Sequence, residues 1–491
     1  GILVAKFNRC EIVPDMRGIA RNSPIYRAYP EYTFRAIGAW AWGYSRCVDA
    51  LLQLGLVDEK CIAFTGLSRG GKTALVAGAL DERATIVNPE APCAGGSCYR
   101  IAMRAITEDG NEVRSEELDD IVRAFPDWMG PDLPAYAGRA AQLPFDEHEL
   151  KALVAPRVLF DSEAKSDIWA NPLGAYQSTE SPYYPWYTFE QYPDRYRTWW
   201  GFDTLPAVNK ENADYQRYLL DPEEGILPRW VEKGACGWRL DVVDELPMPL
   251  VSAMRHAVKQ ADPEAVLLGE VWEDASNKVS YGALRSYCLG DSLDSVMNYP
   301  LRRAVIDFFT GKCDAQQLRR VILHQQEVYP APFYYSLMNV LGSHDRVRIL
   351  NAMAGYDQEG IAQMDRAEAA HIRLTPEQRE AAQAKVLEAF RLLCALPGAP
   401  TVYYGDELGM EGMADPWNRA PMAWDKGDKA MRRALKKILQ ARQAKPMLQT
   451  GFLSVDAPDA DTLIVRRYAV KGRDVFGKPL GGRAVTVKIS R

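Results

Sequence analysis

Three short apolar segments in the second half of this chain each run into an acidic side chain. Residues 238–243 contain Asp241, residues 267–270 end at Glu270, and residues 341–345 end at Asp345. Segments with strand and helix character alternate around them. In repeated βα units the carboxyl ends of parallel strands share one rim, so acids placed there come together. The pattern predicts a parallel sheet of the barrel type with a site on that rim.

The elements of this region are predicted from apolar strand-like runs and from helical periodicity with capping signals. The predicted strands are 236–243, 265–271, 295–300, 336–341 and 401–404, and the predicted helices are 248–259, 301–310 and one that opens at Thr375. Thr375 precedes Pro376 and lies three residues before Gln378, which is the spacing of a capping box. This helix should end before Pro397.

Arg239 and Asp241 are two residues apart, so on a strand both side chains face the same side of the sheet. A charged pair facing an interior is costly unless the two groups pair or line a polar cavity. From this strand alone, a structural ion pair and a functional site are equally good interpretations.

Composition excludes some classes of partner. The chain has 491 residues, 47% of them hydrophobic, and a net charge of −6, so nothing favours nucleic acid or an anionic membrane as partner. No apolar run reaches membrane-spanning length, and no signal segment opens the chain, although it begins at Gly1 rather than methionine. We expect a cytoplasmic protein of two or three domains.

The nine cysteines are scattered, without a CxxC pair and without zinc spacing. Most are expected to be buried thiols of a reducing compartment. Cys93 and Cys98 are close enough in sequence to form a disulfide, which is the alternative for that pair.

The first third of the chain contains a nucleophile motif in its expected setting. A predicted helix at 37–54 stops at Gly55, and a predicted strand at 60–65 runs into Gly-Leu-Ser68-Arg69-Gly, followed by a helix at 73–80. Strand, Gly-x-Ser-x-Gly and helix is the context of a nucleophile elbow. The turn exposes the Ser68 hydroxyl, and the Arg69 amide at the helix N-terminus is placed to hold an oxyanion.

The short sequence motifs around Ser68 resemble those of the glucuronoyl-esterase-like α/β-hydrolases, and the resemblance covers residues 1–173. They include Ala-Trp-Ala-Trp-Gly at 39–43, Asn-Pro-Glu-Ala-Pro-Cys-Ala-Gly-Gly at 88–96, Phe-Pro-Asp-Trp at 125–128, Leu-Pro-Phe-Asp-Glu-His-Glu-Leu at 143–150, Ala-Pro-Arg-Val-Leu-Phe-Asp at 155–161 and Asp-Ile-Trp-Ala-Asn-Pro at 167–172. By this resemblance Ser68 is the nucleophile and Glu90 the acid that orients a histidine, with Glu163 as the alternative acid. The histidine should follow Pro172, where the esterase-like sequence stops, and His148 precedes a strand in a segment that is structural in such enzymes. We therefore expect a truncated domain.

The character of the sequence changes near residues 173–174. Residues 175–190 are dense in aromatic side chains and show neither strand nor helix periodicity. Aromatic faces stack on sugar rings, so this loop suits a carbohydrate cleft. A loop folded around its own rings is the alternative, and composition alone favours it.

The second two-thirds of the chain resembles the α-amylase superfamily, in its neopullulanase and cyclomaltodextrinase branch. The matching motifs run in order from Gly-Ala-Tyr-Gln-Ser at 174–178 through Trp-Trp-Gly-Phe-Asp-Thr-Leu-Pro at 199–206, Gly-Trp-Arg-Leu-Asp-Val-Val-Asp-Glu at 237–245, Leu-Gly-Glu-Val-Trp-Glu at 268–273, Leu-Gly-Ser-His-Asp at 341–345, Thr-Val-Tyr-Tyr-Gly-Asp-Glu-Leu-Gly at 401–409 and Asp-Pro-Trp-Asn-Arg-Ala-Pro-Met at 415–422.

The resemblance implies a role for each matching position. Asp241 is the nucleophile, kept ionised by Arg239, and Glu270 is the general acid and base. Asp345 with His344 binds sugar hydroxyls. Two carboxylates about 5–5.5 Å apart retain the anomeric configuration. Walls of the sugar subsites are assigned to Trp272, Asn298 and the aromatic residues of 175–200.

The resemblance also shows what this chain lacks. The Asp-x-x-x-Asn-His sugar-binding motif of the third barrel strand should precede residue 174, where the sequence is esterase-like instead. Only the last five barrel strands are recognisable. The expected fold class is α/β: a partial α/β-hydrolase (Rossmann-like) sheet over 1–173, then the C-terminal half of a TIM (β/α)8-type barrel over 174–445, then a short C-terminal β segment over 446–491.

The function expected from these features is retaining hydrolysis of α-glucans such as maltodextrin, cyclodextrin or pullulan-like chains. Carboxylester hydrolysis at Ser68 and an inactive fusion of two truncated domains are the alternatives. No metal site or cofactor is predicted from the residues, although the family analogy allows calcium. The oligomeric state is not predicted. If the two halves form separate open sheets, the site is open to water and catalysis should be poor.

Overall fold

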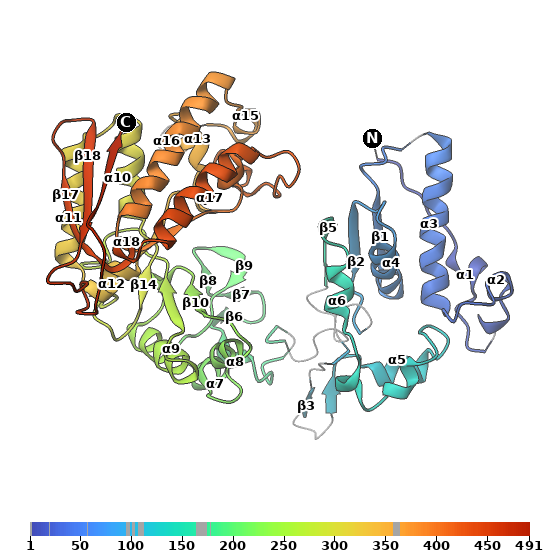
Figure 1. Cartoon of the computed structure of the whole chain (residues 1–491). Helices are drawn as coiled ribbons and strands as arrows, with labels where there is room; N and C mark the ends of the chain where they lie inside the picture. The colour runs from blue at the N-terminus through green and yellow to red at the C-terminus, as the bar shows by residue number, and fades with distance from the viewer. Residues whose placement is uncertain are drawn as a thin grey trace. The chain divides into compact units, whose positions relative to one another are not determined.

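The computed structural model describes residues 2–18, 20–55, 57–94, 99–100, 104–106, 112–163, 174–176, 178–356 and 364–491. The chain divides into two compact units, Gly1–Asn209 and Lys210–Arg491, and each is described by itself (Figure 1). The predicted junction near residue 173, the motif at 167–172 and Cys98 lie outside the described residues, so the junction and the Cys93–Cys98 disulfide stay predictions.

The first unit contains a three-stranded parallel sheet in the order β1-β2-β5. The strands are β1 (Ala63–Leu67), β2 (Ile86–Glu90) and β5 (Val158–Leu159). Helix α4 (Arg69–Leu80) connects β1 to β2 and packs on helix α3 (Ala36–Leu54), with Val48, Phe64 and Leu75 in their shared core. Helix α3 ends at Gly55, whose φ of 64° gives the left-handed stop that the sequence predicts.

The remaining elements of the first unit are short helices and three antiparallel strand pairs, β3-β4, β6-β7 and β8-β9. The helices are α1 (Arg9–Ile12), η1 (Ala20–Asn22), α2 (Pro24–Ala28), α5 (Leu118–Ala124), η2 (Leu133–Tyr136), η3 (Ala140–Gln142), α6 (Glu147–Ala152) and η4 (Tyr184–Trp186). The strands are β3 (Arg104–Ile106), β4 (Glu112–Arg114), β6 (Phe189–Gln191), β7 (Arg195–Tyr196), β8 (Thr198–Trp199) and β9 (Phe202–Pro206).

The aromatic segment 178–200 packs largely on itself. Tyr184 stacks on Phe189 with ring centroids 5.0 Å apart and an interplanar angle of 8°. Tyr192 meets the edges of both rings, and Trp199 stacks on Trp200. The arrangement agrees with a loop folded around its own rings, the alternative that composition favours.

The second unit is built on five parallel strands in sequence order. These are β10 (Gly237–Leu240), β11 (Val266–Gly269), β14 (Ser295–Val296), β15 (Met338–Val340) and β16 (Ala399–Thr401). Strand β10 pairs with β11, β11 with β14, and β15 with β16, while the bridge Met297–Met338 continues the sheet from β14 to β15. A strand is present at each of the five predicted places, but each is shorter than predicted and β16 begins two residues before the predicted 401–404. Asp241, Glu270 and Asp345 lie after the carboxyl ends of β10, β11 and β15.

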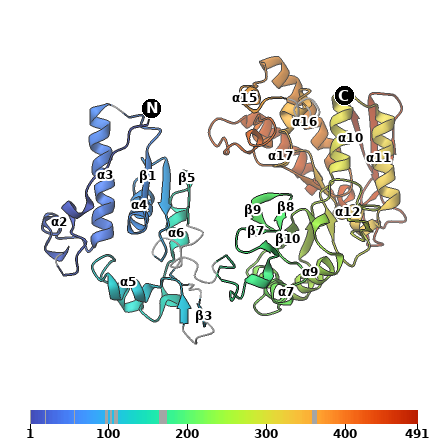
Figure 2. The same cartoon turned by 180° about the vertical axis from the view of Figure 1, so that it is seen from behind.

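The helices of this unit are α7 (Ala213–Leu220), α8 (Ile226–Glu232), η5 (Val243–Glu245), α9 (Met248–Ala261), α10 (Tyr299–Phe309), α11 (Ala315–Val328), α12 (Ala331–Ser336), α13 (Ile349–Met353), α15 (Arg366–Ala369), α16 (Pro376–Ala395), η6 (Asp406–Leu408), η7 (Trp417–Arg419), α17 (Lys429–Gln443) and α18 (Pro446–Thr450). Two of them, α7 and α8, precede β10, and the others come after it. A short hairpin, β12 (Val279–Ser280) with β13 (Ala283–Leu284), lies between β11 and β14. Helices α10 and α11 lie side by side in both views (Figure 2).

The five-stranded sheet is not closed into a barrel within the described residues. There, β10 pairs only with β11, and β16 pairs only with β15. The sheet β1-β2-β5 of the first unit is a separate sheet. In the described residues, the strands of each unit pair only among themselves.

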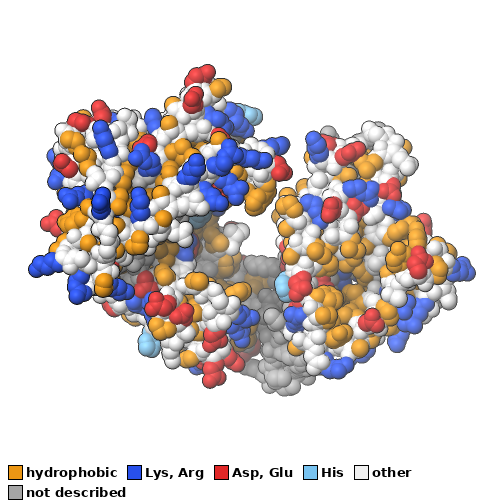
Figure 3. All heavy atoms as spheres, viewed as in Figure 1, with side chains coloured by type: hydrophobic (Ala, Val, Ile, Leu, Met, Phe, Trp, Pro, Cys, Tyr) orange, Lys and Arg blue, Asp and Glu red, His pale blue; other side chains and the backbone are white. Residues whose placement is uncertain are grey.

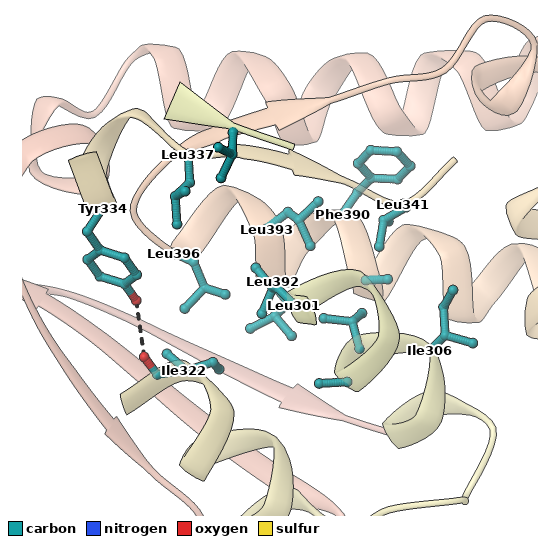
Figure 4. Packing of buried hydrophobic residues seen from close by; sticks show 14 of the residues in the cluster. Leu301, Ile306, Ile322, Tyr334, Leu337, Leu341, Phe390, Leu392, Leu393 and Leu396 are labelled. Atoms are coloured by element: carbon teal, nitrogen blue, oxygen red, sulfur yellow. Dashed lines mark hydrogen bonds between the residues drawn. The ribbon is translucent and has the colours of Figure 1, made fainter. Parts of the chain in front are cut away.

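The core of the second unit lies between this sheet, its helices and the C-terminal strands. Side chains from α10, α11, α12 and α16 meet in it, and the Tyr334 hydroxyl donates to the Ile322 carbonyl oxygen at 3.4 Å (Figure 4). The residues labelled there are Leu301, Ile306, Ile322, Tyr334, Leu337, Leu341, Phe390, Leu392, Leu393 and Leu396. Helix α16 begins with the predicted capping box, in which Gln378 N donates to Thr375 Oγ1 at 3.2 Å.

The C-terminal residues form a three-stranded antiparallel sheet, β17 (Phe452–Asp456), β18 (Thr462–Tyr468) and β19 (Val485–Ser490). Its apolar face belongs to the same core as α11 and α16. Arg467 on β18 is fully buried and donates to the carbonyl oxygens of Ala395, Leu448 and Gly451 at 2.8–2.9 Å. This arginine therefore ties the β segment to the end of α16.

Helix α17 carries a basic face toward solvent. Arg432, Arg433, Lys436 and Lys437 are exposed, and Lys and Arg side chains gather over this helix (Figure 3). None of the helices in the described part of the chain is long and apolar enough to cross a membrane.

The prediction that most cysteines are buried is wrong. Eight cysteines are described, and the seven other than Cys93 are free thiols. Cys10, Cys61 and Cys236 are exposed, whereas Cys93, Cys288 and Cys394 are buried. Free cysteine is usually a buried residue, so the three exposed thiols depart from the general tendency.

Candidate active site

One guanidinium group joins the two carboxylates that follow β10 and β11. Arg239 Nη1 donates to Asp241 Oδ1, and Arg239 Nη2 lies 3.0 Å from Glu270 Oε2. The register pairs Arg239 with Leu268, which sets Glu270 on the neighbouring strand end. The arginine and Asp241 thus form an ion pair that opens onto the rim, because the Asp241 side chain is 75% exposed.

Glu270 is held from both sides of its carboxylate. Oε2 accepts a hydrogen bond from the Val242 amide at 2.9 Å, and Oε1 accepts one from Trp272 Nε1 at 3.0 Å. The residue is only 4% exposed. Asp241 and Glu270 therefore differ sharply in environment: the first faces solvent, and the second lies in a fixed cage of donors.

Val242 supplies one of these donors from a strained backbone. Its φ and ψ of 38° and 57° lie in the left-handed region, which a β-branched residue rarely adopts. Such outliers cluster at functional sites, where the surrounding structure maintains them. Here the unusual turn immediately after Asp241 points the Val242 amide at Glu270.

A chain of side chains links Glu270 to the loop after β15. Trp272 stacks on Tyr299 with centroids 4.9 Å apart, and the Tyr299 hydroxyl donates to Ser343 Oγ at 3.2 Å. Burial raises the pKa of Tyr299, and the nearby Asp345 and Glu270 carboxylates raise it further. The acids after β11 and β15 therefore face the same tyrosine.

Asp345 and His344 are fixed in the loop after β15 by their neighbours. Asp345 N donates to Ser343 Oγ at 3.2 Å, and His344 Nε2 lies 3.3 Å from Asp345 Oδ2. Arg419 Nη2 lies 3.4 Å from Asp345 Oδ1, and Arg419 Nε donates to the His344 carbonyl oxygen. Both predicted residues lie on the rim and are partly exposed.

Asn298 is placed in the core rather than on the rim. It is buried, and its amide exchanges hydrogen bonds with Gln325 and donates to Asn339 Oδ1. Its Oδ1 also caps α10 by accepting from Leu301 N. The predicted role as a sugar-binding side chain does not fit this position, because every polar atom of the amide already has a partner in the fold.

Behind the His344–Asp345 loop lies a buried charged pair. Arg348 and Asp406 are both fully buried and approach to 3.6 Å, and Arg348 lies over the rings of Tyr403 and Tyr404. Both carboxylate oxygens of Asp406 lack a hydrogen-bond partner in the described structure. The Gly342 backbone approaches Asp406 so closely that a Cβ there would collide with the carboxylate.

Burial raises the pKa of Asp406 to about 7 from its ordinary value of 3.8. Between these two values the folded protein holds a proton that the unfolded chain has lost. Unfolding free energy should therefore fall as pH rises from about 4 to 7, by up to about 1.4 kcal/mol per pH unit.

The Asp406→Asn variant lacks this titrating group. We therefore expect its free energy of unfolding in urea to decrease less between about pH 4 and 7 than that of the parent protein. Measurements at pH 5, 6, 7 and 8 test this, with the exposed Asp425→Asn as the matched control. Parallel pH curves for the parent and Asp406→Asn contradict the assignment.

The predicted nucleophile elbow in the first unit has the expected backbone. Ser68 has φ 55° and ψ −119° between β1 and α4, the strained turn that exposes a nucleophile. A Cβ on Gly71 would lie 2.6 Å from the Glu90 carbonyl oxygen, so only glycine fits this close approach. Helix α4 starts at Arg69, four residues before the predicted start.

The other parts of an esterase triad are not assembled in the described residues. There, no histidine hydrogen bonds to Ser68, and exposed His148 lies 3.9 Å from Glu149 instead. The Ser68 amide donates to the Glu90 backbone oxygen, while the Glu90 side chain is exposed. Exposed Glu163, the alternative acid, is described, and the segment after it is not. The Arg69 side chain pairs with Asp15 at 2.5 Å and lies over Trp128.

No group of three or more His, Cys, Asp or Glu side chains in the described part of the chain is placed to hold a metal ion. Calcium therefore stays a prediction of the family resemblance.

Three contributors to the rim were missed from the sequence: Val242, Tyr299 and Arg346, whose guanidinium lies 3.8 Å from the Trp272 ring centroid. Arg419 could have been predicted from the sequence, because it lies in the motif at 415–422.

Comparison with protein families finds two matches along the chain. Residues 169–455 match the model described as the alpha amylase catalytic domain, and residues 1–186 match the model described as glucuronyl esterase, fungi. The first match covers more than half of the chain, and it contains all three rim acids.

Individual relatives agree with the first match. An amylopullulanase from Thermoanaerobacter thermohydrosulfuricus is 33% identical over 349 residues, which are 65% of this chain and 22% of the relative. Neopullulanase 2 from Thermoactinomyces vulgaris is 30% identical over 284 residues, 55% of this chain and 42% of the relative. The chain spans between 18% and 26% of the length of the amylopullulanases that it matches.

Among solved structures, the ligand-free cyclic alpha-maltosyl-(1→6)-maltose hydrolase from Arthrobacter globiformis is similar, with a TM-score of 0.52 and 26% identity. The match covers 70% of this chain and 77% of that one.

Proposed function

This chain belongs to the alpha-amylase family, and we propose that it is a glycoside hydrolase that cleaves α-glucans with retention of anomeric configuration. The observation that carries the proposal is the Arg239 guanidinium between Asp241 and Glu270. It places two carboxylates of different exposure beside each other at neighbouring strand ends, which suits a nucleophile and a general acid.

In the proposed reaction, an Asp241 oxygen attacks the anomeric carbon while the glycosidic C–O bond breaks. Glu270 gives its proton to the departing glycosidic oxygen. Glu270 then takes a proton from water, whose oxygen displaces Asp241 from the anomeric carbon. Two displacements restore the original configuration, and the proton returns to Glu270.

The surrounding residues have positioning roles in this proposal. Arg239 orients Asp241 through their ion pair, and Asp345 with His344 binds hydroxyls of the sugar ring. Trp272 forms a wall of the site and holds Glu270 through its indole N–H. Because Asp241 is largely exposed and the sheet is open, charge stabilisation operates close to the dielectric constant of water. We therefore expect a turnover number below the roughly 10 s⁻¹ that is typical of enzymes.

The proposed substrates are maltodextrins, cyclodextrins and pullulan-like chains, in keeping with the names of the relatives. The amylopullulanase, neopullulanase and cyclomaltodextrinase matches all support this class. Residues 1–173 are proposed to be a truncated α/β-hydrolase segment. A cytoplasmic location is part of the proposal, supported by the seven free thiols other than Cys93 in the described residues. Neither a cofactor nor a calcium ion enters the proposed steps.

Assays of the purified chain on cyclodextrin, maltodextrin, pullulan and a glucuronate ester test this proposal. We expect reducing sugar from the glucans at the same rate in the parent and in Ser68→Ala, because Ser68 lies outside the proposed site. Ester cleavage that is lost in Ser68→Ala, together with inert glucans, contradicts it and favours the esterase alternative.

A further inference from the structure

Trp272 and Tyr299 line a cavity of about 270 Å³ that has a strongly basic wall. Its charged and aromatic lining residues are Trp272, Tyr299, Arg302, Arg303, Asp307 and Arg346. Trp272 connects the cavity to the proposed active site, since its indole N–H donates to Glu270. A ligand in the cavity would therefore contact Trp272, which is hydrogen-bonded to the proposed acid Glu270.

Two of the three arginines keep hydrogen-bonding capacity that the protein does not use. Arg303 pairs with Asp307 at 3.2 Å across one turn of α10. Arg302 Nε donates to the Leu341 carbonyl oxygen at 2.6 Å, and within the described residues its terminal nitrogens have no acceptor. Arg346 Nε is buried and unpartnered in the described structure, while the charge of the nearby Asp345 carboxylate stabilises this guanidinium.

The two unsatisfied guanidinium groups also repel each other. Arg302 is 8% exposed, and burial lowers its pKa to about 10, with the charge of Arg346 lowering it further. Burial lowers the pKa of Arg346 as well. Burying like charges without acceptors is costly, and an anion between them would remove both penalties. The Trp272 ring holds Arg346 in place, with 3.8 Å between the guanidinium carbon and the ring centroid.

We propose that this cavity binds the anionic group of a sugar, a phosphate ester or a uronate carboxylate, so that the enzyme accepts charged α-glucans. The inference deepens the proposed function and rests on it. Planar guanidinium groups bind phosphate and carboxylate oxygens in pairs, which a neutral hydroxyl cannot match. The volume lies just below the roughly 300–1,000 Å³ of drug-sized sites, so it suits one substituted sugar residue rather than a longer chain.

Isothermal titration calorimetry of the whole chain tests the proposal. The probes are inorganic phosphate, glucose 6-phosphate, glucuronate and neutral glucose, each at low and high sodium chloride. We expect the anionic probes to bind at least tenfold more tightly than glucose and to weaken as salt rises. Binding by the phosphates alone, or by glucuronate alone, identifies which of the two anionic groups the site accepts.

Arg346→Gln should weaken binding of the anionic probe at least tenfold, and Arg346→Lys should weaken it less, because the lysine keeps the charge but loses the planar fork. The matched control is Arg466→Gln, which removes an exposed arginine over the ring of Tyr468 on β18. Arg346 is preferred to fully enclosed Arg302, whose loss endangers folding.

Equal binding of glucose and the anions overturns the inference, as does anion binding unchanged by Arg346→Gln. Titration does not require hydrolysis. A chain that binds the anions but cleaves no glucan therefore overturns the proposed function alone, and one that cleaves glucans without binding anions overturns only this inference.

Discussion

Asp241→Asn is expected to abolish α-glucan hydrolysis. The change keeps the size of the side chain but removes the nucleophilic oxygen and half of the ion pair with Arg239. Loss of the nucleophile should reduce kcat by more than the roughly 10²–10⁴-fold that one general acid supplies. Because the side chain is 75% exposed, stability should change little, by well under about 1 kcal/mol.

Release of reducing sugar from maltodextrin, followed over hours, measures this loss against thermal unfolding of the same sample. Asp425→Asn is the matched control, since it makes the same chemical change at an exposed carboxylate of the same unit. Activity of Asp241→Asn within tenfold of the parent contradicts the assignment of the nucleophile.

Glu270→Gln is expected to slow hydrolysis in a way that depends on the leaving group. Natural glucans need a proton at the departing oxygen, so their cleavage should fall by roughly 10²–10⁴-fold. An aryl α-maltoside with an acidic phenol leaves without that proton, so its first step should be nearly retained. The buried site also loses its charge pair with Arg239, which should lower stability.

The ratio of rates on maltodextrin and on the aryl maltoside separates the two effects, because instability reduces both rates alike. Glu273→Gln serves as the control, three residues further along the chain and exposed. Equal losses on the two substrates contradict the role of Glu270 as general acid.

Elements with local signals were predictable from the sequence. The capping box at Thr375, the stop at Gly55 and the five strands, three of them followed by the rim acids, were predicted from short-range patterns. Helix α4 begins earlier than predicted because Gly70 and Gly71 weaken the helical pattern, while close packing of Gly71 on Glu90 favours the helix.

Features that depend on contacts between distant segments were not predictable. The left-handed backbone of Val242 is stabilised by Glu270, 28 residues away. Asn298 was predicted to lie on the rim, but its side-chain amide is hydrogen-bonded to Gln325 and Asn339 in the core. The Arg346–Trp272 contact joins loops from two different strands, and no local pattern marks it.

The open sheet governs how much activity to expect. Family membership accounts for the identities of Arg239, Asp241 and Glu270, but membership does not supply the strands that would enclose them. A carboxylate in solvent gains little from preorganised charges, since their effect falls with rising dielectric constant. Slow cleavage with the proposed residue dependence is therefore the expected behaviour.

The claim that Asp241 is the nucleophile is tested most directly by trapping the covalent intermediate. The Glu270→Gln variant is incubated with a maltosyl fluoride, whose leaving group needs no acid, and the protein is digested and analysed by mass spectrometry. The account predicts one added maltosyl group on the peptide that contains Asp241, absent in the double variant with Asp241→Asn. A maltosyl group on another carboxylate, or complete turnover of the fluoride by the double variant, contradicts it.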